Sequence, residues 1–117
     1  MIPFKLSKNL NHTWFIDLDG TIFVHDRIYF EGRDQLLPGV KELWKSIPDD
    51  DIIVITSARE PELQEVSLHF LTEHGLRYDH AIFGIGHGER IVINDRKPEH
   101  GLETAIAWNV DRNQGFE

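Results

Sequence analysis

Short apolar runs that end in polar residues recur along the chain, and these runs predict buried β-strands. The first run covers residues 13–18 and places Asp17 at the carboxyl end of its strand. Residues 51–56 form the clearest run, because an unbroken Ile/Val series is typical of a parallel strand that is covered on both faces. Three further strands are predicted, at residues 81–83, 90–94 and 104–110.

Two segments between these runs have the spacing of amphipathic helices. The first helix opens near Pro38 and stops before Pro48. Its apolar face consists of Val40, Leu43, Trp44 and Ile47. The second helix follows Pro61 and ends near Gly75, a residue type that commonly caps helices. Its apolar stripe consists of Leu63, Val66, Phe70 and Leu71. A hairpin is predicted earlier, with arms at residues 22–24 and 27–30.

The alternation of strands and helices predicts an α/β protein with an open parallel sheet and flanking helices. In such sheets, ligands bind beyond the carboxyl ends of the strands. The buried strand at 90–94 is expected to end at Asp95, beside the ends of the strands that carry Asp17 and Thr56. The pattern therefore predicts that these polar residues converge at one edge of the sheet.

Composition narrows the classes of partner. A chain of 117 residues is expected to form a single domain, residues 1–117. Its net charge of −8 argues against partners bound by neutralising a phosphate backbone, such as nucleic acid, and against an anionic membrane surface. No apolar run approaches the ~20 residues of a membrane span, and the first residues lack the apolar core of a secretory signal. Cysteine is absent, which fits the cytoplasmic location that we expect.

Asp17-Leu18-Asp19-Gly20-Thr21, at the end of a predicted strand, matches the first motif of the haloacid dehalogenase (HAD) superfamily, D-x-D-G-T. Residues 52–56 resemble the second motif, and residues 91–95 resemble the fourth. Residues 93–98 are also similar to short phosphatases of capsule and surface-polysaccharide synthesis. The resemblance implies a Rossmann-like, capless HAD fold in which residues 21–37 form only a short flap hairpin.

The resemblance also implies an enzyme, a Mg²⁺-dependent phosphomonoesterase that acts on a small phosphorylated sugar or alcohol through an aspartyl-phosphate. In that reading Asp17 is the nucleophile and a metal ligand, because Mg²⁺ prefers oxygen ligands and cancels the repulsion between carboxylate and phosphate. Asp19 is the general acid and base and offers its backbone carbonyl to the metal. Asp95 completes the Mg²⁺ site, and Thr56 holds a phosphoryl oxygen.

The third motif of the family supplies a cation that neutralises the nucleophile and the phosphate. Arg90, just before the fourth motif, and Lys97, just after it, are the two candidates, and the sequence leaves the choice open. The residues expected to contact substrate or phosphate are Leu18, Gly20, Thr21, Thr56, Ser57, Arg59 and Lys97.

Two other functions fit the same motifs. One is a nucleic-acid end phosphatase, which the net charge of −8 disfavours. The other is a non-enzymatic phospho-receiver or binding module, which would not need an acid and base such as Asp19. Transfer of phosphate to an alcohol in place of water also stays open. A capless site is open to solvent, so a homo-oligomer that closes it is a further possibility.

Overall fold

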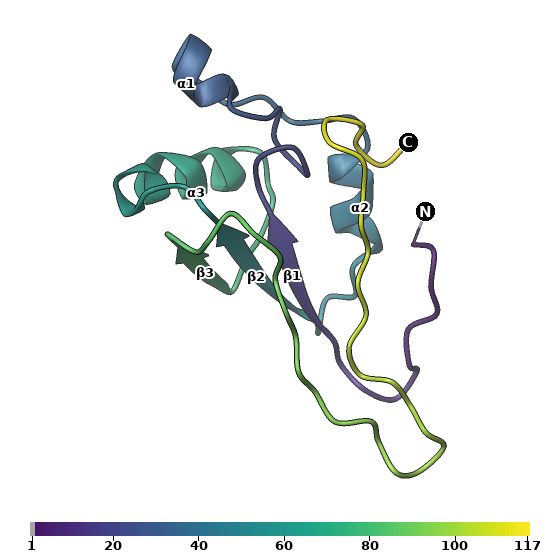
Figure 1. Cartoon of the computed structure of the whole chain (residues 1–117). Coiled ribbons are helices and arrows are strands. Elements are labelled where there is room, and N and C mark those ends of the chain that lie inside the picture. The colour runs from purple at the N-terminus through teal and green to yellow at the C-terminus, as the bar shows by residue number, and fades with distance from the viewer. Residues whose placement is uncertain (1) are drawn as a thin grey trace.

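The computed structural model describes residues 2–117, and at its centre lies a parallel sheet of three strands in the order β1-β2-β3 (Figure 1). These strands are β1 (Thr13–Asp17), β2 (Ile52–Ser57) and β3 (His80–Phe83). In the register, Asp17 lies opposite Thr56, so both residues stand at the carboxyl edge of the sheet. The predicted α/β class and the first three strands are confirmed.

The connections between the strands are helical. Helix α2 (Val40–Ser46) links β1 to β2, and the short helix η1 (Pro61–Leu63) with α3 (Gln64–Glu73) links β2 to β3. Both helices were predicted, and Gly75 after α3 has a left-handed φ of 69°. Between β1 and α2 the chain also forms a five-residue helix, α1 (Arg27–Glu31).

The hydrophobic core lies between the helices and one face of the sheet. Ile16, Ile53 and Ile55 from the strands join Leu43 and Leu71 from α2 and α3, and all five side chains are buried. Burial of such apolar surface is the main driving force of folding, about 25 cal/mol per Å².

The other face of the sheet carries Phe15 and Ile82, which are 61% and 49% exposed. The expectation that helices cover both faces is therefore wrong for residues 2–117. The reason is topological, since right-handed crossovers that always step in the same direction place every helix on the same face.

The prediction of a buried strand at residues 90–94 is also wrong. Ile91, Val92 and Ile93 are 83%, 59% and 94% exposed, and this segment pairs with no strand among residues 2–117. A strand parallel to β1 would have to begin at the opposite edge of the sheet from the end of β3. Residues 84–89 span at most about 20 Å when extended. A parallel crossover normally takes a dozen or more residues, so this connection is too short to return the chain to the start of a parallel strand.

The predicted hairpin at 22–24 and 27–30 is replaced by another pairing. Phe23 forms an antiparallel bridge with Leu36, and the Val24 N–H donates to the carbonyl of Gln35 at 2.9 Å. Residues 27–31 form α1 instead. The physical reason is that Ile22 and Phe23 are both fully buried, so this arm joins the core and does not pair with the exposed segment that follows.

The strand predicted at 104–110 does not form in the described chain, although that segment is extended. Trp108 packs edge-on against Phe4 and Phe116, with ring centroids 5.9 and 5.3 Å apart. Aromatic contacts with both ends of the chain therefore take the place of a strand ladder. Across residues 2–117, no helix combines the length and the apolar character that crossing a bilayer requires.

Candidate functional site

Asp17 closes β1 at the carboxyl edge of the sheet and keeps a partly exposed carboxylate. The Thr21 hydroxyl donates to its Oδ2 at 3.1 Å, and Nη2 of Arg90 lies 3.3 Å from its Oδ1. Burial raises the pKa of Asp17 above its ordinary value, and the Arg90 cation and the Thr21 hydrogen bond offset this effect only in part. The Asp17 carboxylate is therefore partly desolvated but remains accessible to a ligand.

A tight turn carries the chain from Asp17 to Asp19 and back into the core. The carbonyl of Leu18 accepts hydrogen bonds from three successive N–H groups, those of Thr21, Ile22 and Phe23, at 3.2, 3.0 and 2.9 Å. Gly20 has a φ of 82°, which an L side chain rarely adopts. The side chain of Leu18 is fully buried, which anchors the turn between the two aspartates.

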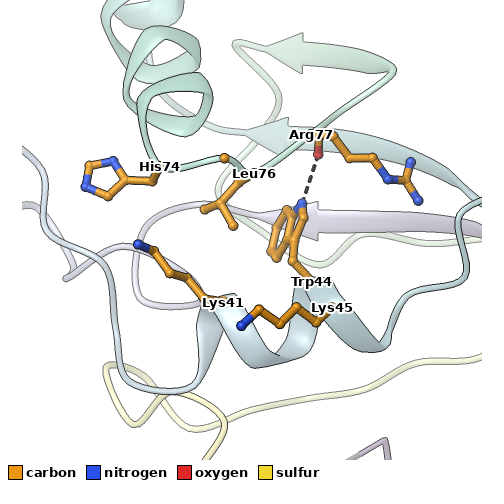
Figure 2. Close-up of a pocket in the computed structure, with 7 residues that line it drawn as sticks. Lys41, Trp44, Lys45, His74, Leu76 and Arg77 are labelled. Carbon is orange, nitrogen blue, oxygen red and sulfur yellow. Dashed lines mark hydrogen bonds between the residues drawn. The ribbon is translucent and has the colours of Figure 1, made fainter.

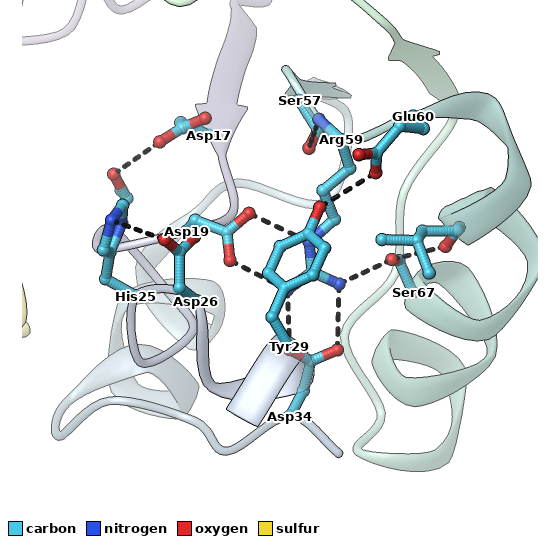
Figure 3. A network of polar contacts seen from close by, with 12 residues as sticks. Asp17, Asp19, His25, Asp26, Tyr29, Asp34, Ser57, Arg59, Glu60 and Ser67 are labelled. Carbon is cyan, nitrogen blue, oxygen red and sulfur yellow. Dashed lines mark hydrogen bonds and ion pairs between the residues drawn. The ribbon is translucent and has the colours of Figure 1, made fainter. Parts of the chain in front are cut away.

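Arg59 lies at the centre of a buried polar network, which Figure 3 shows together with Asp19. Its Nε and Nη2 donate to the two carboxylate oxygens of Asp19, both at 2.9 Å. Nη1 and Nη2 donate to the carboxylate of Asp34 at 3.0 and 2.6 Å, and Nη1 also donates to the Ser67 hydroxyl at 2.7 Å. All five donors of the guanidinium are thus engaged by protein groups.

This network keeps Arg59 charged although the residue is only 2% exposed. Burial alone lowers its pKa, but the hydrogen bonds and charges of Asp19 and Asp34 outweigh this and raise it. The guanidinium also lies 5.2 Å above the ring of Phe23. Arg59 was predicted to contact the substrate phosphate, whereas here every one of its N–H groups points to a residue of the chain itself.

Thr56 and Ser57, the last residues of β2, have different surroundings. Ser57 is fully buried, and its hydroxyl accepts the N–H of Arg59 at 3.0 Å, so it caps the turn that follows the strand. Thr56 is half-buried, and its hydroxyl has no hydrogen-bond partner within the part of the chain that the structure describes. Of these two hydroxyls, that of Thr56 is free to bind a ligand beside Asp17.

Helix α1 is tied to the same edge of the sheet by one side-chain contact. The Tyr29 hydroxyl donates to Oε2 of Glu60 at 2.9 Å. Partial burial and the neighbouring Glu60 carboxylate raise the pKa of Tyr29 to about 12, so the phenol stays a neutral donor. This contact brings the flap segment next to the loop that carries Arg59.

Asp95 and Lys97 are not brought to this site. The Lys97 N–H donates to the carbonyl of Leu102 and closes a turn, and that turn lies beyond the end of the sheet where the strands begin (Figure 1). The Asp95 carbonyl accepts the Thr104 hydroxyl next to this turn. Of the two candidates for the third motif, the structure therefore places Arg90, and not Lys97, beside Asp17.

Sequence reasoning missed two members of the site, Asp34 and Ser67. Asp34 is 8% exposed and comes from the loop before α2, while Ser67 is fully buried in α3. An aspartate in a loop and a serine in a helix are unremarkable in sequence. Only the observation that a buried arginine needs anionic partners could have pointed to Asp34.

A shallow pocket elsewhere is unrelated to these carboxylates. It is lined by α2 and the segment after α3, and Figure 2 shows Trp44 donating from Nε1 to the carbonyl of Arg77, a distance of 2.9 Å. Lys41 and Lys45 stand at its rim, and no acidic residue lines it. It holds no carboxylate that could serve as the predicted nucleophile, so the strand edge at Asp17 is the candidate site.

Comparison with known proteins found no relative of the chain. No family model matches the chain, and no curated protein or solved structure is significantly similar to it. The function is therefore argued from the residues of the site.

Proposed function

We propose that the chain is a HAD-type phosphomonoesterase that hydrolyses a small phosphorylated sugar or alcohol, with Asp17 as the nucleophile. The observation that carries the proposal is the surroundings of Asp17. Its carboxylate is partly desolvated at a strand end, it lies beside one cation, and the free hydroxyl of Thr56 stands opposite it in the register. Such a carboxylate can attack phosphorus while neighbouring donors hold the phosphoryl oxygens.

The reaction takes two steps. An oxygen of Asp17 attacks phosphorus and the bond to the leaving oxygen breaks, so that an aspartyl-phosphate forms while Asp19 protonates the departing alkoxide. Water then attacks phosphorus and passes a proton to Asp19, which releases inorganic phosphate and restores Asp17. Arg90, 3.3 Å from Asp17, offsets the negative charge that gathers there. Each Asp19 oxygen accepts one N–H of Arg59 and keeps a second lone pair that can take the proton.

The resemblance implies Mg²⁺ held by Asp17, Asp19 and Asp95, but the residues as arranged do not fit that ion. Across residues 2–117 no group of three or more acidic or histidine side chains is placed to share a metal. Asp95, the second carboxylate of the implied set, is exposed, and its carbonyl accepts the Thr104 hydroxyl next to a turn far along the chain from β1. We therefore derive no step through the ion, and the magnesium requirement stays a prediction.

The first test is phosphate release from p-nitrophenyl phosphate and from a panel of sugar and alcohol phosphates. We expect turnover by the wild-type chain and none above background for Asp17→Asn. Asp49→Asn is the matched control, because Asp49 is exposed in the loop before β2 and should leave activity unchanged. Wild-type rates in Asp17→Asn, with normal folding by circular dichroism, would contradict the assignment of the nucleophile.

A further inference from the structure

Arg59 has two carboxylate partners that differ in their exposure. The carboxylate of Asp34 is 2% exposed and lies within the protein, whereas that of Asp19 is 18% exposed and lies at the edge that carries Asp17. Asp34 alone supplies one full negative charge against the guanidinium. Electroneutrality of the buried arginine therefore does not require Asp19.

The geometry of the second pair restricts Asp19 strongly. Two parallel N–H bonds of 2.9 Å, from Nε and from Nη2, fix both the position and the plane of the Asp19 carboxylate. Arg59 itself cannot turn, because Asp34 and Ser67 hold its opposite side and Phe23 lies against its face. Asp19 is thus oriented by a rigid, buried support that comes from the turn after β2, from α3 and from the loop before α2.

We propose that Arg59 is a positioning residue, which holds Asp19 as an oriented carboxylate ready to take a proton from the water that hydrolyses the aspartyl-phosphate. This inference rests on the proposed function. Asp34 acts one step further away, since its carboxylate accepts hydrogen bonds from Arg59 and fixes that side chain. Formation of the aspartyl-phosphate depends less on Arg59, because a good leaving group departs without a proton.

The two steps can be separated with p-nitrophenyl phosphate in a rapid-mixing experiment. Release of p-nitrophenolate reports formation of the aspartyl-phosphate, and release of inorganic phosphate reports its breakdown. Arg59→Lys keeps the positive charge but loses the two parallel N–H groups that bind Asp19. For this variant we expect a fast burst of about one equivalent of p-nitrophenolate. Steady turnover should then be at least about tenfold slower than in the wild type, whereas kcat/KM should stay within about twofold, because kcat/KM reports the unchanged first step.

Three further variants distinguish positioning from a merely structural role. Asp34→Asn should show the same burst with a smaller loss of steady rate, because it acts only through Arg59. Asp19→Asn combined with Arg59→Lys should be no slower than Asp19→Asn alone, since residues that act as a unit are non-additive. Arg77→Lys is the matched control, because Arg77 is anchored by the carbonyls of Asp51 and Pro48 away from the site.

The inference is overturned if Arg59→Lys slows the burst as much as the steady rate, or if its effect adds fully to that of Asp19→Asn. Either result would show a general loss of structure or of substrate binding. A wild-type chain that hydrolyses no phosphomonoester would remove the proposed function, and the inference with it. Active wild type with a normal steady rate in Arg59→Lys would remove the inference alone.

Discussion

At the scale of single residues, the two neighbouring aspartates of the site differ in how tightly an arginine pairs with them. Asp19 receives two short N–H bonds from a buried arginine, whereas Asp17 receives one contact of 3.3 Å from Arg90, whose side chain is 41% exposed. A tightly paired carboxylate is oriented but engaged, and a loosely paired one stays available to react. This difference in pairing supports the proposal that Asp17 is the nucleophile and Asp19 the acid and base.

A second buried carboxylate, that of Asp51, lies at the other end of the sheet and predicts a pH effect on stability. It accepts hydrogen bonds from Nε1 of Trp14 and from the backbone N–H and Nδ1 of His12, each at 2.9 Å. Burial raises the pKa of Asp51, but these hydrogen bonds outweigh that effect and leave the pKa below its ordinary value. An acid whose pKa is lowered on folding stabilises the protein above its unfolded pKa, about 3.9.

We therefore expect Asp51→Asn to lower the free energy of unfolding by about 1–3 kcal/mol at neutral pH, as loss of a buried hydrogen-bond acceptor does. The difference from wild type should shrink between pH 5 and pH 3, because that stabilising contribution of Asp51 is lost as the pH falls through its folded pKa. Urea unfolding at pH 7, 5 and 3 measures this. A difference that stays constant across the range would contradict the ionised state of Asp51.

At the scale of elements, the start of helix α2 contacts the C-terminal segment. Gly39 precedes the helix with a left-handed φ of 77°, and a Cβ there would lie 2.9 Å from the backbone carbon of Phe116. The Phe116 N–H donates to the carbonyl of Pro38, also at 2.9 Å. The start of α2 is therefore packed directly against the end of the chain.

This contact predicts different costs for two glycine substitutions. Gly32 has nearly the same φ, 74°, but nothing lies within 4 Å of its would-be Cβ. Gly32→Ala should cost only the left-handed strain, about 1–2 kcal/mol, and Gly39→Ala should cost at least about 1 kcal/mol more because the C-terminal segment must move. Thermal or urea unfolding compares them. Equal costs would show that residues 115–117 do not pack against α2 in solution.

At the scale of the whole molecule, residues 85–110 leave apolar surface exposed. Ile91, Val92 and Ile93 are β-branched and largely exposed, and β1 has a strand neighbour on only one side among residues 2–117. Exposed runs of this kind commonly mark surfaces that pack against something else. The path of this segment also decides where Asp95 lies, so it bears directly on the magnesium prediction.

We expect EDTA to abolish phosphate release and added Mg²⁺ to restore it, because a divalent cation offsets the charge of the phosphoryl group. Titration of activity against Mg²⁺ measures the requirement, and activity that persists in EDTA would exclude it. Asp95→Asn tests the path of residues 85–110. An unchanged Mg²⁺ requirement would support the path in Figure 1, whereas a raised requirement would show that Asp95 approaches Asp17 in the working protein.

The sequence by itself determined the elements whose signals are local. The apolar periodicity of α2 and the unbroken apolar run of β2 predict their own burial, and the turn after Asp17 follows from Gly20. In α3 the predicted apolar stripe is only partly right, because Leu71 is buried whereas Val66 is 48% exposed. These patterns are complete within a few residues, because each reflects the geometry of one helix, strand or turn.

Tertiary structure decided what depends on partners far apart in the chain. The pairing of Arg59 with Asp34, the replacement of the flap hairpin by α1 and the exposed course of residues 90–94 all rest on such contacts. A buried arginine pairs with whichever carboxylates the fold places next to it. A strand forms only where the connecting loop is long enough for it to reach a neighbouring strand. Neither condition can be predicted from the local sequence.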